Sequence, residues 1–309
     1  MPLFLSERDV ESLLTPGDAV PIVEDCFRRL AAGTIENLPR RRLAVDDGAF
    51  ALMAAVDHEL GFAGVKSYVT VAGRSAFAVC LYGLERGELV AVLEADALGQ
   101  RRTGAASGVA AKHLARSGAT TLGVIGCGWQ AEAQVEAIRA AVPTVERVLA
   151  YCRTAERQQA FCARTGAEPA ESAAQAAAQE IVVTITTSRD PVLRGEWLRA
   201  GALVCAAGAN DPRKRELDDV ALERAGFVCC DSKENARLES GDLIDPVRNG
   251  VLDWLEVHEL HEVVAAEMPG RESDDDIVVF KSNGLAAWDV AIAAELLRRA
   301  RERGVGTEL

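Results

Sequence analysis

Hydrophobic and polar positions follow one rhythm in the first part of the chain and a different one in the remainder. Residues 6–33 show helical spacing in two stretches separated by Pro16-Gly17, and the second stretch ends at Gly33. Residues 40–95 hold short β-type runs separated by glycines, which is typical of a meandering antiparallel sheet. The small residues from Thr103 to Arg116 then predict one further helix.

After Gly118, short apolar runs alternate with helical stretches. Strands are expected at residues 121–126, 147–152, 181–187, 202–207, 226–231 and 277–281. Strands that alternate with helices in this way indicate a parallel, doubly wound sheet. The last segment, residues 286–309, predicts an amphipathic helix that ends in a basic turn, as the helix dipole favours.

These patterns together predict an α/β fold with two domains. Residues 1–116 form an N-terminal α+β domain, and residues 117–285 form a Rossmann-type domain with a doubly wound parallel sheet. The length of 309 residues is consistent with two domains of ordinary size, or with one large domain.

Composition narrows the classes of partner. The net charge of −13 argues against binding to nucleic acid or to an anionic membrane surface. We find no apolar run long enough to span a bilayer and no charged-then-apolar leader at the N-terminus. We therefore expect a soluble, cytoplasmic protein.

Eight cysteines and four histidines raise the question of disulfides or a metal. There is no Cys-x-x-Cys pair, and Cys229 and Cys230 are adjacent, so we expect reduced thiols. His258 and His261 have a spacing that can hold a metal on one helix face, but no third ligand is identifiable. We therefore expect no metal site.

The stretch Gly-Cys-Gly-Trp-Gln-Ala at residues 126–131 follows a predicted strand and opens a predicted helix. In that context Gly-x-Gly-x-x-Ala is typical of a dinucleotide-binding turn. Gly126 would permit the tight turn, Gly128 would let the backbone approach a pyrophosphate, and Ala131 would keep helix and strand close. The N–H groups at the helix N-terminus would then bind the phosphates. The other interpretation is a tight turn with no ligand.

The next predicted strand ends in VLAYCRTAER, where no carboxylate is placed to hold a ribose 2′-hydroxyl. Arg153 lies at that strand end, and Arg157 follows one turn later. A guanidinium in this position would accommodate a 2′-phosphate. The sequence therefore favours NADP(H) as the cofactor, with NAD(H) as the alternative.

Several basic residues of the N-terminal part lie in apolar surroundings. Lys66 stands in the middle of a predicted strand, where a buried ammonium is costly unless it is paired, so it either reaches solvent or faces a polar site. Arg102 directly precedes the small-residue helix, whose small side chains leave room for a ligand near its N-terminus. The alternative for each of these residues, and for the run Arg40-Arg41-Arg42, is a solvated charge at a strand edge.

The chain resembles the ornithine cyclodeaminase/mu-crystallin family over nearly its whole length. The resemblance rests on PRRRL (39–43), GVK (64–66), RTGAASGVAAKHLAR (102–116), GCGWQAEAQ (126–134), GANDPRKRELD (208–218) and FKSNGLAAWD (280–289). It implies NAD(P)H binding and action on α-imino or α-amino acids. It also implies a substrate-binding and dimerisation role for residues 1–116, with the C-terminal helix packing back, and a homodimer formed through the N-terminal sheet.

The resemblance assigns roles to individual residues. Arg41 and Arg102 would grip the substrate carboxylate, for which bidentate guanidinium geometry is suited. Lys66 would lie beside the reacting carbon, with its pKa lowered by desolvation and flanking arginines, as a proton donor or carbonyl polariser. The resemblance matches Trp129 and Gln130 to the phosphate turn and places Thr186, Ala207, Lys214 and Ser282 near the cofactor. With the residues of the turn and the strand end, the full set of expected cofactor-binding residues is Thr103, Gly126, Gly128, Trp129, Gln130, Arg153, Thr154, Thr186, Ala207, Lys214 and Ser282.

One departure from the family bears on the reaction. The cyclodeaminase uses an aspartate after the fifth strand for proton transfer, and the corresponding residue here is Asn210, with Asp211 one position later. An amide cannot take up and release a proton as a carboxylic acid does. If Asn210 occupies that position, imine reduction is favoured over redox-neutral cyclodeamination. A shift of one residue would place Asp211 there instead.

The resulting hypothesis is an NAD(P)H-dependent reductase or dehydrogenase of small α-imino or α-amino acids. One alternative is a cyclodeaminase of ornithine or lysine that retains NAD. The other is a non-catalytic protein that binds NADPH or a small ligand, as mu-crystallin-like proteins do. The presence of Arg41, Lys66 and Arg102 together argues against the non-catalytic alternative.

Overall fold

The computed structural model describes residues 1–309. The chain divides into two compact units, one made of residues Met1–Arg102 and Leu285–Leu309 and the other of Thr103–Gly284. The division falls inside helix α3 (Asp96–Leu114), whereas the sequence pattern places a boundary after this helix. The C-terminal segment belongs to the first unit by its contacts.

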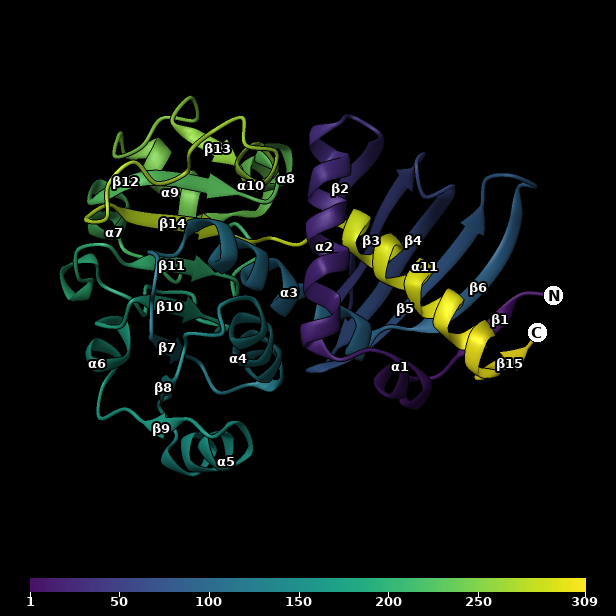
Figure 1. Ribbon diagram of the computed structural model, residues 1–309, viewed down its shortest axis with the longest axis horizontal. Coiled ribbons are helices and arrows are strands. Elements are labelled where there is room, and N and C mark those ends of the chain that lie inside the picture. Colours follow the sequence, from purple (N-terminus) through teal and green to yellow (C-terminus); the bar gives the residue numbers. More distant parts are fainter. The chain divides into compact units, whose positions relative to one another are not determined.

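The first unit is built on a seven-stranded sheet with the order β15-β1-β6-β5-β4-β3-β2 (Figure 1). Five of its strands form the antiparallel meander that the glycine-separated runs predict: β2 (Ile35–Val45), β3 (Gly48–Asp57), β4 (Phe62–Val71), β5 (Arg74–Gly83) and β6 (Glu88–Glu94). Two short strands near the chain ends were not predicted. β1 (Leu3–Leu5) runs parallel to β6, and β15 (Thr307–Glu308) pairs with β1 in the antiparallel direction.

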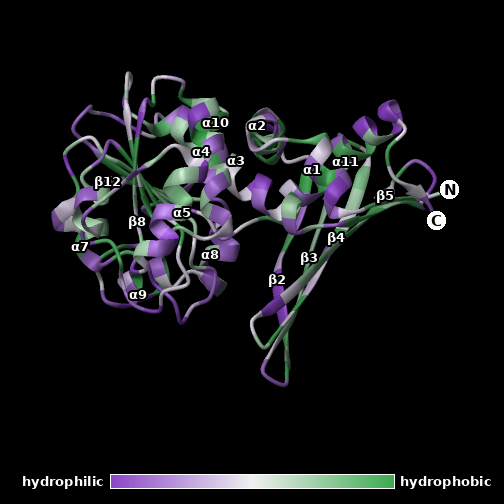
Figure 2. Ribbon diagram, turned by 90° about the horizontal axis from the view of Figure 1, so that it is seen from below, coloured by the Kyte–Doolittle hydropathy of each residue, from purple (hydrophilic) through white to green (hydrophobic).

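Helices cover one face of this sheet and leave the other face without a helix (Figure 2). They are α1 (Glu7–Leu13), α2 (Pro16–Ala31) and α11 (Ala286–Arg303). Ser6 and Thr15 each form a capping box with the residue three positions on, which sets where α1 and α2 begin. Two helices form as expected, but the break between them falls at Leu14 and Thr15 and not at Pro16-Gly17. Pro16 occupies the first turn of α2, where its missing N–H is not needed.

Helix α3 begins seven residues earlier than the sequence pattern predicts. The side chain of Glu7 accepts hydrogen bonds from the backbone N–H of Asp96 (2.6 Å) and of Ala97 (2.9 Å), which caps the helix from a distant part of the chain. The prediction that Arg102 precedes the helix is therefore wrong. Arg102 lies within α3, in its second turn.

The second unit contains eight parallel strands in the order β13-β12-β14-β11-β10-β7-β8-β9. The strands are β7 (Thr121–Ile125), β8 (Arg147–Tyr151), β9 (Glu168–Pro169), β10 (Ile181–Thr184), β11 (Leu203–Ala206), β12 (Ala225–Cys230), β13 (Val257–Glu259) and β14 (Ile277–Lys281). The connecting helices are α4 (Trp129–Ala141), α5 (Ala155–Thr165), α6 (Ala173–Ala177), η1 (Gly195–Trp197), α7 (Asp219–Glu223), α8 (Lys233–Glu239), α9 (Gly241–Arg248) and α10 (Leu260–Val264). The predicted Rossmann-type, doubly wound sheet is confirmed.

The strand order of this sheet reverses between β7 and β10. From β7 the chain proceeds through β8 to β9 on one side, and it then returns to β10 on the other side of β7. In open α/β sheets, ligands bind outside the carboxyl ends of the strands at such a reversal. Any dinucleotide site is therefore expected at the ends of β7 and β10.

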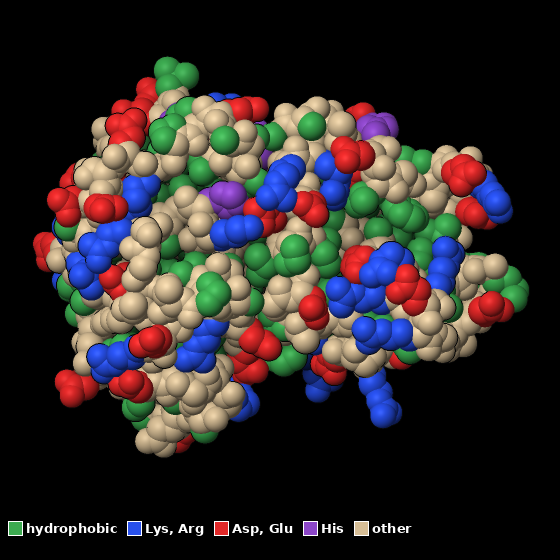
Figure 3. All heavy atoms as spheres, in the orientation of Figure 1, with side chains coloured by type: hydrophobic (Ala, Val, Ile, Leu, Met, Phe, Trp, Pro, Cys, Tyr) green, Lys and Arg blue, Asp and Glu red, His purple; other side chains and the backbone are tan.

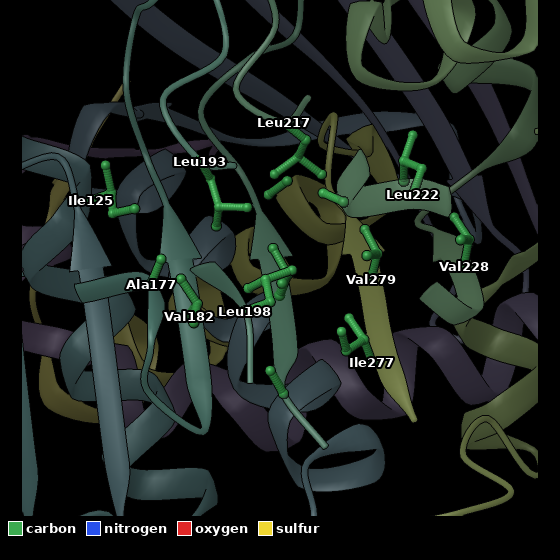
Figure 4. Packing of buried hydrophobic residues seen from close by; sticks show 14 of the residues in the cluster. Ile125, Ala177, Val182, Leu193, Leu198, Leu217, Leu222, Val228, Ile277 and Val279 are labelled. Atoms are coloured by element: carbon green, nitrogen blue, oxygen red, sulfur yellow. The ribbon is translucent and has the colours of Figure 1, made fainter. Parts of the chain in front are cut away.

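The core of the second unit lies between the sheet and its helices. Both faces of the central strands are covered, so β10 and β11 are buried over their whole length and their sequences read as continuous apolar runs. Figure 4 shows Ile125, Val182 and Val279 from three strands packing with Leu193 and Leu217 from the connections. This packing holds the carboxyl ends of the strands at fixed positions.

No helix of the protein is long and apolar enough to cross a membrane. On the face seen in Figure 3, acidic and basic side chains are interspersed and do not gather into a broad basic area.

Candidate active site

Lys66 is buried in the first unit and faces a polar group. It lies on β4 opposite Met53 of β3, on the side of the sheet that packs against the helices, and only 3% of the residue is exposed. Its Nζ donates a hydrogen bond of 2.8 Å to Oδ1 of Asp289. A Cβ atom at Gly99 would lie 2.9 Å from this Nζ, so the glycine leaves room for the ammonium group.

Arg102 shares the same carboxylate oxygen. Its Nε donates to Oδ1 of Asp289 at 3.2 Å, and its guanidinium carbon lies 5.8 Å from the ring centroid of Trp288. Asp289 stands in the first turn of α11, where the helix dipole favours a negative charge. One buried carboxylate therefore holds two cations from two other elements, and we call Lys66, Arg102 and Asp289 the buried ion cluster.

The electrostatics of this cluster set the protonation of its members. Burial lowers the pKa of Lys66 to about 8; the charges of Arg102 and Arg40 act in the same direction, and Asp289 opposes them. Burial by itself raises the pKa of Asp289, but the charges and hydrogen bonds of Arg102 and Lys66 outweigh it, so this pKa lies below its ordinary value. Lys66 is therefore protonated at neutral pH and able to release its proton slightly above it.

The structure places Arg40, and not Arg41, near the buried ion cluster. β2 contains one extra residue between Leu38 and Arg41 relative to β3, which is a β-bulge. As a result, Arg41 pairs with Leu52, on the face of the sheet that no helix covers, and is exposed. Arg40 is only 6% exposed, and its charge acts on Lys66. The expectation that Arg41 lies beside Lys66 and Arg102 does not agree with this geometry.

Sequence reasoning did not identify Asp289 as a functional residue. It is 1% exposed and is an acidic residue within the otherwise apolar first turns of α11. A carboxylate among apolar helix residues is rarely buried unless it is paired. The single aspartate in this apolar stretch could therefore have indicated a buried cation.

The glycine turn of the second unit has the geometry that a dinucleotide requires. Gly126 has a φ of 114°, and a Cβ atom there would collide with the carbonyl oxygen of Ile185, so only glycine fits. Gly128 is the N-cap of α4 and has no side-chain cap, and nothing lies within 4 Å of a Cβ atom built on it. The N-terminus of this helix therefore lies at the reversal between β7 and β10, with open space beside Gly128.

A cavity of about 400 Å³ adjoins this turn. Its walls include Gly126, Gly128, Arg153, Thr154 and Arg157, and they contain no aspartate or glutamate. Thr186 and Ser188 line it from the loop after β10. The glycine turn and the polar side chains of this wall fit a nicotinamide dinucleotide, and Arg153 and Arg157 add positive charge to the wall.

A buried glutamate, Glu216, accepts hydrogen bonds from the loops next to the glycine turn. Oε1 of Glu216 accepts from the backbone N–H of Thr186 (2.6 Å), and Oε2 accepts from that of Gly208 (2.7 Å) and from the hydroxyl of Thr184 (3.1 Å). Burial, offset in part by the charge of Lys281, raises the pKa of Glu216. Sequence reasoning missed this residue, which positions the backbone after both β10 and β11. Ala207, the first residue after β11, donates its N–H to the carbonyl of Thr184 (2.9 Å).

Asp231 holds the loop after β14 in the same way, by accepting hydrogen bonds from it. Its Oδ2 accepts from the backbone N–H of Asn283 (2.7 Å) and Gly284 (2.6 Å) and from the hydroxyl of Ser282 (3.3 Å). Burial raises the pKa of Asp231 to about 6. Ser282, the first residue after β14, is thereby held at the carboxyl end of the sheet.

The remaining predicted cofactor residues lie at or near the same edge. Trp129 and Gln130 begin α4, Thr154 is the N-cap of α5, and the carbonyl of Thr103 accepts a hydrogen bond from Gln134 of α4 (3.2 Å). Lys214 is half-buried in the loop after β11.

Asn210 lies in the loop after β11 and is half-buried. The neighbouring Asp211 receives two hydrogen bonds from the guanidinium of Arg213, at 2.9 and 2.7 Å. The carboxylate next to Asn210 is thus engaged by an exposed arginine.

The histidines and cysteines are arranged differently from a metal site. His258 stacks on Phe227 with ring centroids 5.0 Å apart, and its Nδ1 lies 3.5 Å from Glu262. No group of three or more histidine, cysteine or acidic residues is placed to hold a metal ion, and the eight cysteines are free thiols.

Comparison with known proteins agrees with this arrangement. The sequence profile of the ornithine cyclodeaminase/mu-crystallin family matches residues 1–304. The chain is 36% identical to alanine dehydrogenase of Archaeoglobus fulgidus, over 99% of this chain and 98% of that protein.

Two solved structures are closely similar. Delta(1)-pyrroline-2-carboxylate reductase of Thermococcus litoralis, in complex with NADH and L-proline, has a TM-score of 0.94 and 32% identity, covering 99% of this chain and 100% of that one. An archaeal alanine dehydrogenase dimer with bound NAD has a TM-score of 0.93 and 34% identity, covering 100% of this chain and 98% of that one.

Proposed function

Because the chain belongs to the ornithine cyclodeaminase/mu-crystallin family, we propose that it reduces small α-imino acids and oxidises the corresponding α-amino acids. It is an NAD(P)-dependent oxidoreductase that acts on CH–NH or CH–NH2 groups, the class of its named relatives. The observation that carries the proposal is the buried ion cluster, in which Lys66 has a pKa of about 8 beside Arg40 and Arg102.

Arg40 and Arg102 bind the substrate carboxylate in this proposal. Both guanidinium groups are buried, and the positive charge of each acts on Lys66. Such a site favours a monoanion, and the planar guanidinium offers it two parallel hydrogen bonds. Binding in this way fixes the position of the neighbouring C=N carbon.

Lys66 supplies the proton for imine reduction in this proposal. The nicotinamide, when bound, supplies a hydride to the carbon of the C=N bond or removes one from the amino acid. The Lys66 ammonium donates its proton toward the imine nitrogen, which makes the imine a better hydride acceptor. With a pKa of about 8, Lys66 is charged at neutral pH and regains its proton readily after each turnover.

The function is tested with purified protein, Delta(1)-pyrroline-2-carboxylate and either reduced nicotinamide dinucleotide. We expect the reduced nicotinamide to be consumed and L-proline to form in equal amount. Pyruvate with ammonia, tested in parallel, extends the assay to an acyclic imine. If the protein reduces no cyclic imine and no mixture of a 2-oxo acid and an amine, the proposed function is wrong.

The same assay separates the two alternatives. A cyclodeaminase would release ammonia from ornithine or lysine with no net change in the nicotinamide, and a binding protein would turn nothing over. Asn210 in the loop after β11, with Asp211 engaged by Arg213, supports reduction, because no unengaged carboxylate stands there for proton transfer.

We further propose that the protein prefers NADP(H). Arg153 and Arg157 both line the cavity beside the glycine turn, and no acidic side chain lines it to hold a free ribose 2′-hydroxyl. A 2′-phosphate would meet two guanidinium groups there.

Replacing Arg153 with aspartate should weaken NADPH binding and improve NADH binding, since it removes an attractive charge and adds a repulsive one. A charge-assisted hydrogen bond contributes about 1.5–3 kcal/mol, so the preference should shift by at least about tenfold. KM for both cofactors in both proteins measures this shift. Arg147→Asp is the control, because Arg147 lies at the opposite end of β8 and changes the net charge equally. A wild type that prefers NADH, or an unchanged ratio, would contradict the assignment.

We also propose a homodimer formed through the uncovered face of the first unit's sheet. Neighbouring strands align apolar side chains on this face in rows such as Val56, Ala63 and Tyr82. Leu38 and Leu52 are exposed on the same face, at 65% and 37%. An apolar sheet face of this kind is typical of a partner interface.

Leu52→Asp should convert the dimer to a monomer, because each interface would bury two unpaired carboxylates. Light scattering after gel filtration measures the mass. Leu255→Asp is the control, since Leu255 is 85% exposed in a loop of the other unit. A wild-type monomer, or an unchanged mass in Leu52→Asp, would exclude this interface.

A further inference from the structure

One oxygen of Asp289 has no role in the contacts described so far. Oδ1 receives both Lys66 Nζ and Arg102 Nε, whereas Oδ2 is buried and has no hydrogen-bond partner. A buried carboxylate oxygen without a donor is unfavourable, because its hydration is lost and nothing replaces it. The chain would gain stability from any donor that reaches this atom.

The substrate class supplies such a donor. A protonated imine and the ammonium of an amino acid both carry N–H groups and positive charge, and both require an acceptor when they leave water. The charged side chains that act on one another in this cluster are Arg40, Lys66, Arg102 and Asp289. Three of them are donors only, so Asp289 is the acceptor among them.

We propose that Oδ2 of Asp289 binds the substrate nitrogen and thereby makes the site selective for C=N over C=O. This inference rests on the proposed function, which places an α-imino acid beside Lys66. Arg40 and Arg102 hold the carboxylate, Lys66 protonates the imine nitrogen, and Oδ2 of Asp289 accepts from the N–H group that this proton transfer creates. A 2-oxo acid presents an oxygen with lone pairs to the same atom, which leaves Oδ2 unpaired and adds repulsion.

The proposal is tested by binding, with ligands that differ at the nitrogen. The first pair is L-proline and cyclopentanecarboxylate, and the second is L-alanine and propionate, so that the result does not depend on one side chain. Calorimetry with saturating reduced cofactor, which cannot oxidise the amino acids, gives each Kd. The wild type should bind the amino acid of each pair at least about tenfold more tightly, as expected for a hydrogen bond between charged groups.

Asp289→Asn should abolish this preference, because it weakens the binding of the amino acids more than that of the matched carboxylates. The amide keeps the size of the side chain but removes its charge, and the carboxylate site is made by the arginines. Glu295→Gln is the matched control, since Glu295 lies on the same helix and pairs with Arg298 and Arg299. It should keep the wild-type preference.

Asp289→Asn that folds and still prefers the amino acids would overturn the proposal. The wild type tests the proposal even if the variant does not fold. Equal affinities for the two ligands of each pair would overturn the proposal, and so would the absence of any amino-acid binding. Failure of the proposed function is a separate result: selective binding of the amino acids without any imine reduction would support nitrogen recognition and exclude the reductase.

Discussion

Replacing Lys66 with methionine is expected to reduce kcat for imine reduction by about 10²- to 10⁴-fold, the usual contribution of a positioned acid. Methionine fills a similar volume but carries no proton and no charge. The loss should appear mainly in kcat, because the arginines that bind the carboxylate remain. Steady-state kinetics with a cyclic imine measures the effect. An unchanged kcat would remove Lys66 from the chemistry.

The wild type should show a matching dependence on pH. Burial lowers the pKa of Lys66 to about 8, so its ammonium form predominates below that pH and disappears above it. Reduction needs the protonated form, so kcat/KM should fall as the pH rises through about 8, and oxidation should improve. This alkaline limb should be absent from the residual activity of Lys66→Met. The affinity for the dinucleotide serves as the control, because the glycine turn belongs to the other unit.

Replacing Arg102 with lysine should lower kcat/KM by about 30- to 150-fold, which corresponds to about 2–3 kcal/mol of transition-state binding. Lysine keeps the charge but loses the planar fork that binds a carboxylate through two hydrogen bonds. It also cannot donate from Nε to Asp289, as Arg102 does at 3.2 Å. If Arg102→Lys has the same kcat/KM as the wild type, this arginine does not bind the substrate.

Arg40→Lys and Arg41→Lys form a matched pair for the same assay. Arg40 is buried near the cluster and should behave like Arg102, whereas Arg41 faces the other side of the sheet and should have no such effect on substrate binding. A loss confined to Arg41→Lys would restore the assignment that the sequence resemblance suggests.

Which of Arg40 and Arg41 faces the buried ion cluster could not be predicted from the sequence. Three consecutive arginines follow Pro39, and alternation along a strand assigns them to opposite faces only if the register is known. The bulge between Leu38 and Arg41 shifts that register by one residue. Nothing in the sequence of β2 alone locates the bulge, since it depends on pairing with β3.

The start of α3 was misjudged for a similar reason. Its first turn is capped by Glu7, which lies 89 residues earlier in the chain than Asp96. A helix start that depends on a distant side chain has no local capping pattern to reveal it. The carboxylates that position the cofactor loops, Glu216 and Asp231, were missed because each acts through hydrogen bonds to loops from other parts of the sequence.

The sequence by itself determined what depends on neighbouring residues. Alternating strands and helices predicted the parallel sheet, and the spacing of Gly126, Gly128 and Ala131 predicted the turn, because each position has a local conformational or steric requirement. The tertiary structure decided whether Lys66 reaches solvent or a partner. That partner is Asp289, 223 residues further along the chain, and a buried charge is stable only where folding brings its counter-charge within hydrogen-bond distance.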